Sequence, residues 1–320
     1  MINKLIHYLL LSIVASLIAC TPPAKESAKP KLPTTPFIMV LGTAQDAGYP
    51  QAACKKACCQ KVWSGEATKK LVSCLGLVDP ASGKHWIFDA TPDFKEQLHL
   101  IQELPAAQGK DLSGIFLTHA HMGHYTGLMD LGREAMGAKE VPVFAMPRMV
   151  DYLTNNGPWS QLVSLENIRL NALRVDSTIQ LNDDLKVTPF LVPHRDEYSE
   201  TVGFKIEGAN RSAIFIPDID KWSKWNKNIV EEIKQVDYAF LDGTFFQNGE
   251  LPGRDMRLIP HPFVEESMAL FSTLSEEDKR KVYFIHFNHT NPLLQEGSAA
   301  QQQVKEAGFN VAKGLDWVDL

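Results

Sequence analysis

Three histidines within six residues constrain the fold of this chain more than any other feature. The apolar run at residues 114–117 predicts a buried strand, and a second run at residues 125–131 predicts the start of a helix. His119, His121 and His124 lie on the turn between them. A strand fixes the direction of the turn that leaves it, and neutral imidazoles are good nitrogen ligands for one metal ion. This spacing favours a metal site over a set of ordinary loop histidines.

Strands are expected in both halves of the chain, with helices between them and no visible internal repeat. This order of elements favours two sheets packed face to face with helices outside. The other expected strands are residues 37–42, 71–79, 85–89, 142–145, 168–173, 177–181, 185–192, 201–207, 211–216, 238–241 and 282–285. The other expected helices are residues 92–104, 147–154, 229–234, 262–274 and 292–307.

Side chains that can bind a metal stand at or just past the carboxyl ends of several expected strands. Each one alone is an ordinary turn residue. Strand ends of packed sheets can converge on one edge, so together they predict one site built from distant parts of the sequence. The residues are His119, His194, Asp218, Asp242 and His286.

The composition is that of a soluble globular protein. Of the 320 residues, 44% are hydrophobic and 22% are charged, which is enough apolar material for a large core in one large or two modest domains. The net charge of −6 and the absence of a basic run argue against a nucleic-acid partner. A small-molecule substrate is the expected partner.

The first residues are expected to be a targeting segment. Lys4 precedes the apolar run at residues 5–17, which is short for a membrane span. The run ends at Ala19-Cys20 in a pattern that resembles the lipobox of bacterial lipoproteins. We therefore expect a signal peptide at residues 1–19 and a lipidated Cys20, with an ordinary cleaved signal or a short anchor as the alternatives.

The residues after Cys20 are expected to be a flexible tether. Residues 20–36 are rich in Pro, Lys and Ala, and the folded domain is expected over residues 37–320. Such a protein would be exported and anchored to a membrane through its lipid, at the outer membrane or the periplasmic side of a Gram-negative cell.

Four further cysteines leave two interpretations open. An exported protein with Cys54, Cys58, Cys59 and Cys74 could form two disulfides. The adjacent Cys58 and Cys59, a short step from Cys54, look more like a metal-binding knuckle.

The histidine stretch Thr118-His-Ala-His-Met-Gly-His124 resembles the His-x-His-x-Asp-His motif of the metallo-β-lactamase superfamily. His194, Asp218 and His286 fall in the order of the later metal ligands. Within the superfamily, the chain is most similar to the pyrroloquinoline quinone biosynthesis protein B group. The similar stretches are residues 41–51, 126–134, 241–244 and 285–292. The resemblance implies an αββα sandwich, an α/β fold of two packed mixed β-sheets flanked by helices.

The resemblance also implies the metal ligands. His119, His121 and His194 would bind one zinc ion, and a weaker second ion would be held by His124, Asp218 and His286. The motif departs from the usual form because Gly123 stands where the family has an aspartate that binds the second metal. One fully occupied site, or a weak second one, is therefore expected.

A third metal site is implied by related phosphodiesterases of the superfamily, in which cysteines and a late histidine hold a structural zinc. Cys54, Cys58, Cys59 and His289 match these positions, although the cysteine spacing differs from that of the family. Cys74 is a spare candidate, and a disulfide with free thiols is the alternative.

The implied activity is metal-assisted hydrolysis of an ester, lactone or phosphodiester-type bond. The metal would lower the pKa of bound water from about 15.7 towards ~7, which gives hydroxide at neutral pH. With Gly123 in the motif, Asp218 or Asp242 would position this water. His261, which opens a helix, matches an active-site histidine and would donate a proton, whereas a plain helix-start histidine is the alternative.

Two other functions remain open. The first is oxidative chemistry in quinone-cofactor assembly, which would need iron in the histidine site. The second is a metal-binding lipoprotein without catalysis. Trp159, Trp222 and Trp225 hint at aromatic walls near the site, and His85 and His99 are expected to be structural.

Overall fold

The computed structural model describes residues 32–320. The expected signal peptide, Cys20 and most of the tether lie outside the described residues and stay predictions. Within the described part of the chain, no helix is long and apolar enough to span a membrane.

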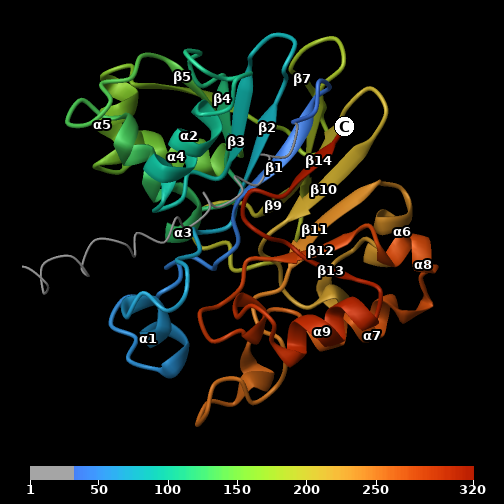
Figure 1. Ribbon diagram of the computed structural model, residues 1–320. Helices are drawn as coiled ribbons and strands as arrows, with labels where there is room; N and C mark the ends of the chain where they lie inside the picture. Colours follow the sequence, from blue (N-terminus) through green and yellow to red (C-terminus); the bar gives the residue numbers. More distant parts are fainter. Residues whose placement is uncertain (1–31) are drawn as a thin grey trace, which may run out of the picture. The chain divides into compact units, whose positions relative to one another are not determined.

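Two mixed sheets of seven strands each form the centre of the described chain (Figure 1). The first has the order β14-β1-β2-β3-β4-β5-β6 and the second β13-β12-β11-β10-β9-β8-β7. The strands of the first sheet are β1 (Phe37–Gly42), β2 (Cys74–Val78), β3 (His85–Phe88), β4 (Gly114–Phe116), β5 (Val141–Ala145), β6 (Ile168–Ala172) and β14 (Trp317–Asp319). Those of the second are β7 (Ile179–Gln180), β8 (Lys186–Leu191), β9 (Val202–Glu207), β10 (Ser212–Ile216), β11 (Tyr238–Asp242), β12 (Val282–Ile285) and β13 (Asn310–Val311).

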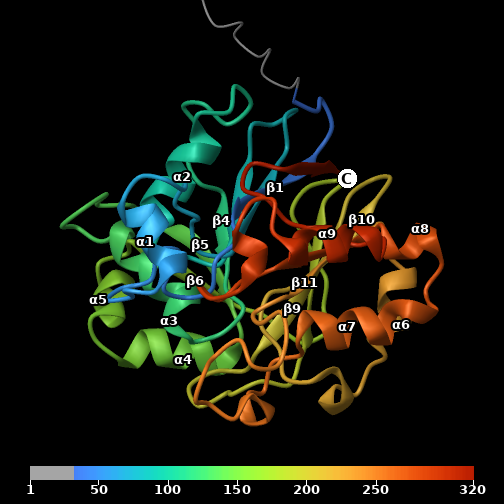
Figure 2. The same ribbon diagram turned by 60° about the horizontal axis from the view of Figure 1, so that its bottom comes forward.

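Helices cover the outer sides of the two sheets. In both views α2, α4 and α5 lie on one side of the pair of sheets and α6 to α9 on the other (Figures 1 and 2). The expected αββα sandwich is therefore confirmed. The helices are α1 (Ala57–Trp63), α2 (Phe94–Gln102), α3 (Met122–Tyr125), α4 (Pro147–Asn155), α5 (Trp159–Ser164), α6 (Ile229–Lys234), α7 (Val264–Leu270), α8 (Glu276–Lys279) and α9 (Ala299–Glu306). Short 3-10 helices are η1 (Thr126–Leu131), η2 (Trp222–Lys224), η3 (Met256–Leu258), η4 (Phe271–Thr273) and η5 (Pro292–Leu294).

The alternation of side chains along the strands builds two apolar layers. In β10, Phe215 joins the cluster between the sheets, whereas Ile214 and Ile216 join the cluster under the helices. This follows from the strand period of two. Between the sheets, the ring of Phe204 packs edge-on against Phe88 at a centroid distance of 5.5 Å. Burial of each such side chain contributes roughly 1.5–3 kcal/mol, so this layer fixes how the sheets face each other.

The expected helix over residues 292–307 is wrong as a single element. The chain forms η5, then a turn in which Gly297 has a φ of +72°, and only then α9. The Ser298 side chain accepts a hydrogen bond from the Gln301 N–H and so starts the new helix. The expected helix over residues 125–131 is likewise a 3-10 helix that follows the four-residue α3.

Seven elements have no counterpart in the expected list. They are the helices α1, α5 and α8, the 3-10 helices η2 and η3, and the short strands β13 and β14. β14 completes the first sheet by pairing antiparallel to β1, with Phe37 opposite Asp319.

Candidate metal centre

Strands from both sheets end at one edge, and the residues that follow them form the candidate site. In the second sheet β10, β11 and β12 are parallel neighbours, so Asp218, Asp242 and His286 emerge at the same end. In the first sheet β3 and β4 are parallel, and the turn after β4 carries His119. The expected convergence of strand ends is thus present in the fold.

The first group of side chains contains His119, His121, His194 and Asp218, whose candidate ligand atoms all lie within 4.8 Å of one another. Asp218 Oδ2 is 3.0 Å from His194 Nε2 and 3.4 Å from His119 Nε2. His121 Nδ1 lies 3.2 Å from His194 Nε2. Three nitrogens and one carboxylate oxygen at this separation match the donor set of a tetrahedral zinc site, in which each bond is about 2.0–2.2 Å long.

The second group contains His124, His286 and a residue that sequence reasoning missed, Asp46. Asp46 Oδ1 is 3.2 Å from His124 Nε2 and 3.6 Å from His286 Nε2. Asp218 lies between the two groups, because its Oδ2 is also 4.0 Å from His124 Nε2. The structure therefore brings together all six expected metal ligands and adds a second carboxylate.

Two buried aspartate–threonine pairs orient the histidines. The Thr118 hydroxyl donates to Asp89 and lies 3.0 Å from His119 Nδ1, while Asp89 Oδ2 is 2.7 Å from His124 Nδ1. In the second sheet, the Thr244 hydroxyl lies 3.0 Å from His286 Nδ1. Holding one ring nitrogen fixes the tautomer and aims the other nitrogen at a metal.

The hydrogen bonds of Asp242 place it behind the ligands. The backbone N–H and the hydroxyl of Thr244 both donate to its Oδ1, and the Ile219 N–H donates to its Oδ2. Asp242 is fully buried, and these bonds fix its carboxylate, which can therefore orient the neighbouring groups.

Ligand atoms at the centre have no hydrogen-bond partner in the described part of the chain. They include Nε2 of His119, His124 and His286 and Oδ1 of Asp46 and Asp218, all of them buried. A buried polar atom without a partner costs free energy, about 1–3 kcal/mol each. Atoms of this kind that point at one another are what metal ligands look like without their ion, so the residues fit a metal.

The charges of the site support the same interpretation. Burial and the nearby charge of His124 hold the pKa of His119 well below its usual range, so its imidazole is neutral and can bind a metal. Burial opposes ionisation of Asp218, but His194 and His261 hold its pKa well below the usual range.

The backbone at the site is also unusual. His286 has a φ of +67°, and backbone strain in a non-glycine residue is a frequent feature of functional sites.

Comparison with known proteins supports the geometry. A family model described as a beta-lactamase superfamily domain matches residues 85–287, more than half of the chain. The chain belongs to the metallo-β-lactamase superfamily.

Among relatives of this superfamily member, the coenzyme PQQ synthesis protein B of Klebsiella pneumoniae (strain 342) is 27% identical, over 86% of this chain and 96% of the relative. The protein of the same name from Methylobacterium sp. (strain 4-46) is 25% identical over the same shares. The crystal structure of Zn²⁺-bound PqqB from Methylobacterium extorquens matches with a TM-score of 0.75 at 22% identity, over 89% of this chain and all of that one. A diphosphatase from the PhnP family matches with a TM-score of 0.62 at 23% identity, over 88% and 96%.

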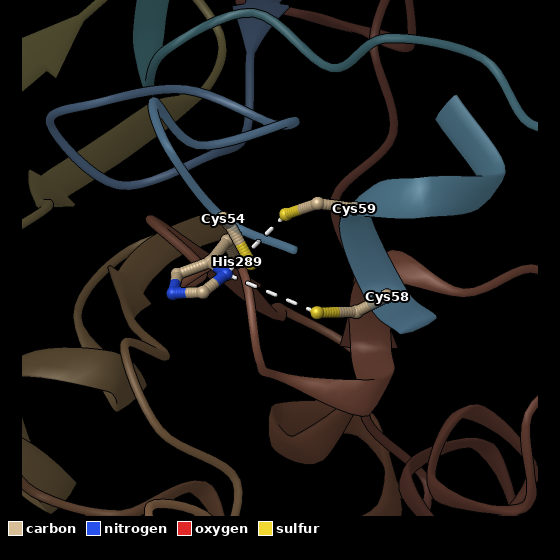
Figure 3. A group of neighbouring side chains, drawn as sticks. All are labelled: Cys54, Cys58, Cys59 and His289. Atoms are coloured by element: carbon tan, nitrogen blue, oxygen red, sulfur yellow. Dashed lines mark hydrogen bonds between the residues drawn. The ribbon is translucent and has the colours of Figure 1, made fainter. Parts of the chain in front are cut away.

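Three cysteines and one histidine form a further candidate metal site, separate from the two histidine groups. Cys58 and Cys59 on α1, Cys54 before it and His289 after β12 turn toward one another (Figure 3). Their ligand atoms all lie within 4.8 Å, and His289 Nδ1 is 3.4 Å from Cys59 Sγ. This is the donor set of a Cys₃His structural zinc site.

All four described cysteines are free, so the two-disulfide interpretation is wrong for this structure. Cys74 is not part of the group either, since it is buried in β2 and its thiol donates to the Asp89 carbonyl. Burial raises the pKa of Cys59 to about 12, so metal uptake at this site would have to displace a proton from its thiol.

His261 lies at the rim of the centre. Its Nδ1 is 2.9 Å from Asp242 Oδ2 and 3.1 Å from Asp218 Oδ1. Burial alone would lower the pKa of His261, but these two carboxylates raise it well above its usual value. The side chain also lines a cavity of about 450 Å³, so it is a proton-carrying group beside open space.

Two of the three tryptophans are not walls of the site. Trp222 and Trp225 are buried in the apolar cluster under the helices, and their indole N–H groups donate to Ser267 and to the Leu191 carbonyl. A large apolar ring whose indole N–H is hydrogen-bonded is typical of a tryptophan in the core. Trp159 instead packs against Tyr125, one residue after His124, at a centroid distance of 4.9 Å.

Sequence reasoning missed Asp46, Asp89, Thr118 and Thr244 as parts of the centre. Asp89 and Thr118 stand at the ends of expected strands, as the expected ligands do, and that position was the available signal. For Asp46 the signal was only indirect. Gly123 leaves the histidine motif without its usual carboxylate, which indicates that a carboxylate from elsewhere could replace it but not which one.

Proposed function

We propose that this chain is a metal-dependent hydrolase of the metallo-β-lactamase superfamily. The observation that carries the proposal is the convergence of His119, His121, His194 and Asp218 beside a second donor group, with buried ligand atoms that lack other partners. Adjacent sites that share a carboxylate suit hydrolysis, in which the attacking and the leaving oxygen both need stabilisation. Zinc fits the histidine-rich donor set.

In this proposal each residue has a defined task. His119, His121 and His194 would hold the first ion, with Asp218 between the two groups. A metal bound there would polarise the bond to be cleaved and lower the pKa of water. Asp89 and Thr118 keep the histidine rings in their binding orientation. His261, held by Asp242, carries a proton at the edge of the cavity and is placed to give it to the leaving group.

The cavity beside His261 favours a negatively charged substrate. Arg195 and Arg254 line it together with Asn288. Neither arginine takes part in a salt bridge among residues 32–320. Unpaired guanidinium groups bind carboxylates and phosphates through paired hydrogen bonds.

We expect Arg254→Ala to raise KM for anionic substrates about tenfold, since a hydrogen bond to a charged group contributes about 1.5–3 kcal/mol. The matched control is Arg257→Ala, because Arg257 lies three residues away but pairs with Asp255 and does not line the cavity. KM measured with charged and uncharged versions of one ester tests this. Equal effects of the two variants would exclude an anion-binding role for Arg254.

The function itself is tested by removing and restoring metal. We expect the purified protein to carry about two to three zinc ions per chain and to hydrolyse at least one of an ester, lactone, phosphodiester and β-lactam panel. A chelator should abolish turnover and added zinc should restore it. Bound metal without turnover on any substrate would instead support a metal-binding protein that is not an enzyme.

The second candidate is a PqqB-like role in pyrroloquinoline quinone biosynthesis with iron-dependent oxidative chemistry. The names of the relatives, which align over most of their length, support this candidate better than they support hydrolysis. The paired donor groups are the reason to place hydrolysis first. Iron in the histidine groups together with oxygen consumption would decide for the second candidate.

A further inference from the structure

Gly123 is a position without room for a side chain. A Cβ atom there would lie 2.3 Å from Asp46 Oδ1, 2.4 Å from the Asp46 Cα and 2.8 Å from its Cβ. Since the Cα belongs to the backbone, a change of rotamer would not relieve the collision. The space that a motif aspartate would enter is therefore filled by Asp46.

The loop that carries Asp46 is tied to the strand end that carries His286. The Gln45 N–H donates to the Phe287 carbonyl at 2.8 Å, and the Phe287 N–H donates to the Thr43 carbonyl at 2.8 Å. Ala44 forms a bridge with Phe287 as well. These bonds fix the three residues directly before Asp46, so the backbone, and not the side chain alone, sets the position of its carboxylate.

The Asp46 carboxylate points at the Nε2 atoms of two histidines, and these atoms have no hydrogen-bond partner in the described part of the chain. His124 and His286 are fully buried, and their Nε2 atoms lie 3.2 and 3.6 Å from Asp46 Oδ1. Their opposite ring nitrogens are already held by Asp89 and Thr244. One carboxylate oxygen and two aimed nitrogens around one point form three ligands of a divalent metal site.

We infer that Asp46 replaces the carboxylate missing at position 123 and, with His124 and His286, binds a second divalent metal ion of the zinc type. The carboxylate comes from the loop after β1, and Gly123 is the residue that makes room for it. This inference rests on the proposed metal centre, but its test measures bound metal, so it can fail while hydrolysis by one metal stands.

The alternative is a purely electrostatic contact. Burial opposes a charge on His124, yet Asp89 and Asp46 raise its pKa well above the usual value, so without metal a proton can occupy the space between the groups. This alternative predicts that loss of Asp46 changes stability and leaves metal binding as it was.

Metal titration of the whole protein separates the two. We expect Asp46→Asn to bind one metal ion fewer, or to bind that ion at least about 10²-fold more weakly, while the first histidine group and the cysteine group stay filled. Asp151→Asn, a change of an exposed aspartate on α4, is the matched control and should bind metal like the natural protein. Cobalt substitution followed by visible spectroscopy gives a readout that does not depend on turnover.

A substitution at Gly123 gives a second test. We expect Gly123→Ala, which adds only a Cβ, to displace the Asp46 backbone and to weaken binding of the second ion, while the first histidine group and the cysteine group stay filled. If Gly123→Ala does not fold, Asp46→Asn still tests the inference, because it keeps the size of the Asp46 side chain. Unchanged metal content and affinity in Asp46→Asn would overturn the proposal, and so would a folded Gly123→Ala variant that binds the second ion like the natural protein.

Discussion

Replacing His121 by alanine is expected to lower kcat/KM by about 10³-fold or more. His121 belongs to the first histidine group, and loss of a ligand removes the several kcal/mol of charge stabilisation that a metal provides. Because the side chain is partly exposed and its removal opens no core cavity, the melting temperature measured without metal should change little. Bound zinc should fall by about one ion per chain.

His99→Ala is the control for this variant. His99 lies on α2, is exposed, and belongs to none of the metal-binding groups. It should keep full activity and full metal content. Turnover of His121→Ala equal to that of the natural protein would remove the first histidine group from catalysis.

Replacing Cys58 and Cys59 by serine is expected to remove a different ion and to destabilise the protein. These thiols and His289 join α1 to the chain after β12, so the metal would cross-link parts that are distant in sequence. We expect a loss of at least about 3 kcal/mol, or roughly 5–10 °C in the melting temperature of the zinc-loaded protein. Calorimetry and zinc analysis of the same samples measure both quantities.

Cys74→Ala is the matched control because Cys74 is also a free cysteine but lies outside the group. It should keep its zinc and lose only the small stability of a truncated core side chain. An unchanged zinc content in the Cys58 and Cys59 variant would show that the group is not a metal site.

The fold could be predicted because its long elements carry periodic signals. β12 matches the expected strand at residues 282–285, and β10 lies within the expected strand at residues 211–216. β13 and β14 have two and three residues, too few for an alternating pattern to appear. α9 starts later than expected because a turn at Gly297 interrupts an otherwise helical stretch. This turn needs the positive φ of Gly297, which the spacing of apolar residues does not reveal.

The candidate site was predictable where a ligand follows a strand. His194 and Asp218 could be found because each comes after a readable strand. Asp46 could not, since it lies in an irregular loop whose path is fixed by bonds to Phe287. The prediction that Trp222 and Trp225 line the site was wrong. A single tryptophan carries no periodic signal in the sequence, and the large rings of these two are buried in the core.

One segment of chain links the cysteine group to the second histidine group. It runs from Asp46 to Cys59, and the Gln51 N–H donates to the Cys59 sulfur while the Tyr49 hydroxyl donates to the Cys58 carbonyl. The opposite ligands, His286 and His289, are also close neighbours in sequence. An ion that orders one end of this segment reduces the conformational entropy left to lose at the other. The two groups should therefore bind metal cooperatively, and by reciprocity each ion should raise the affinity for the other by the same factor.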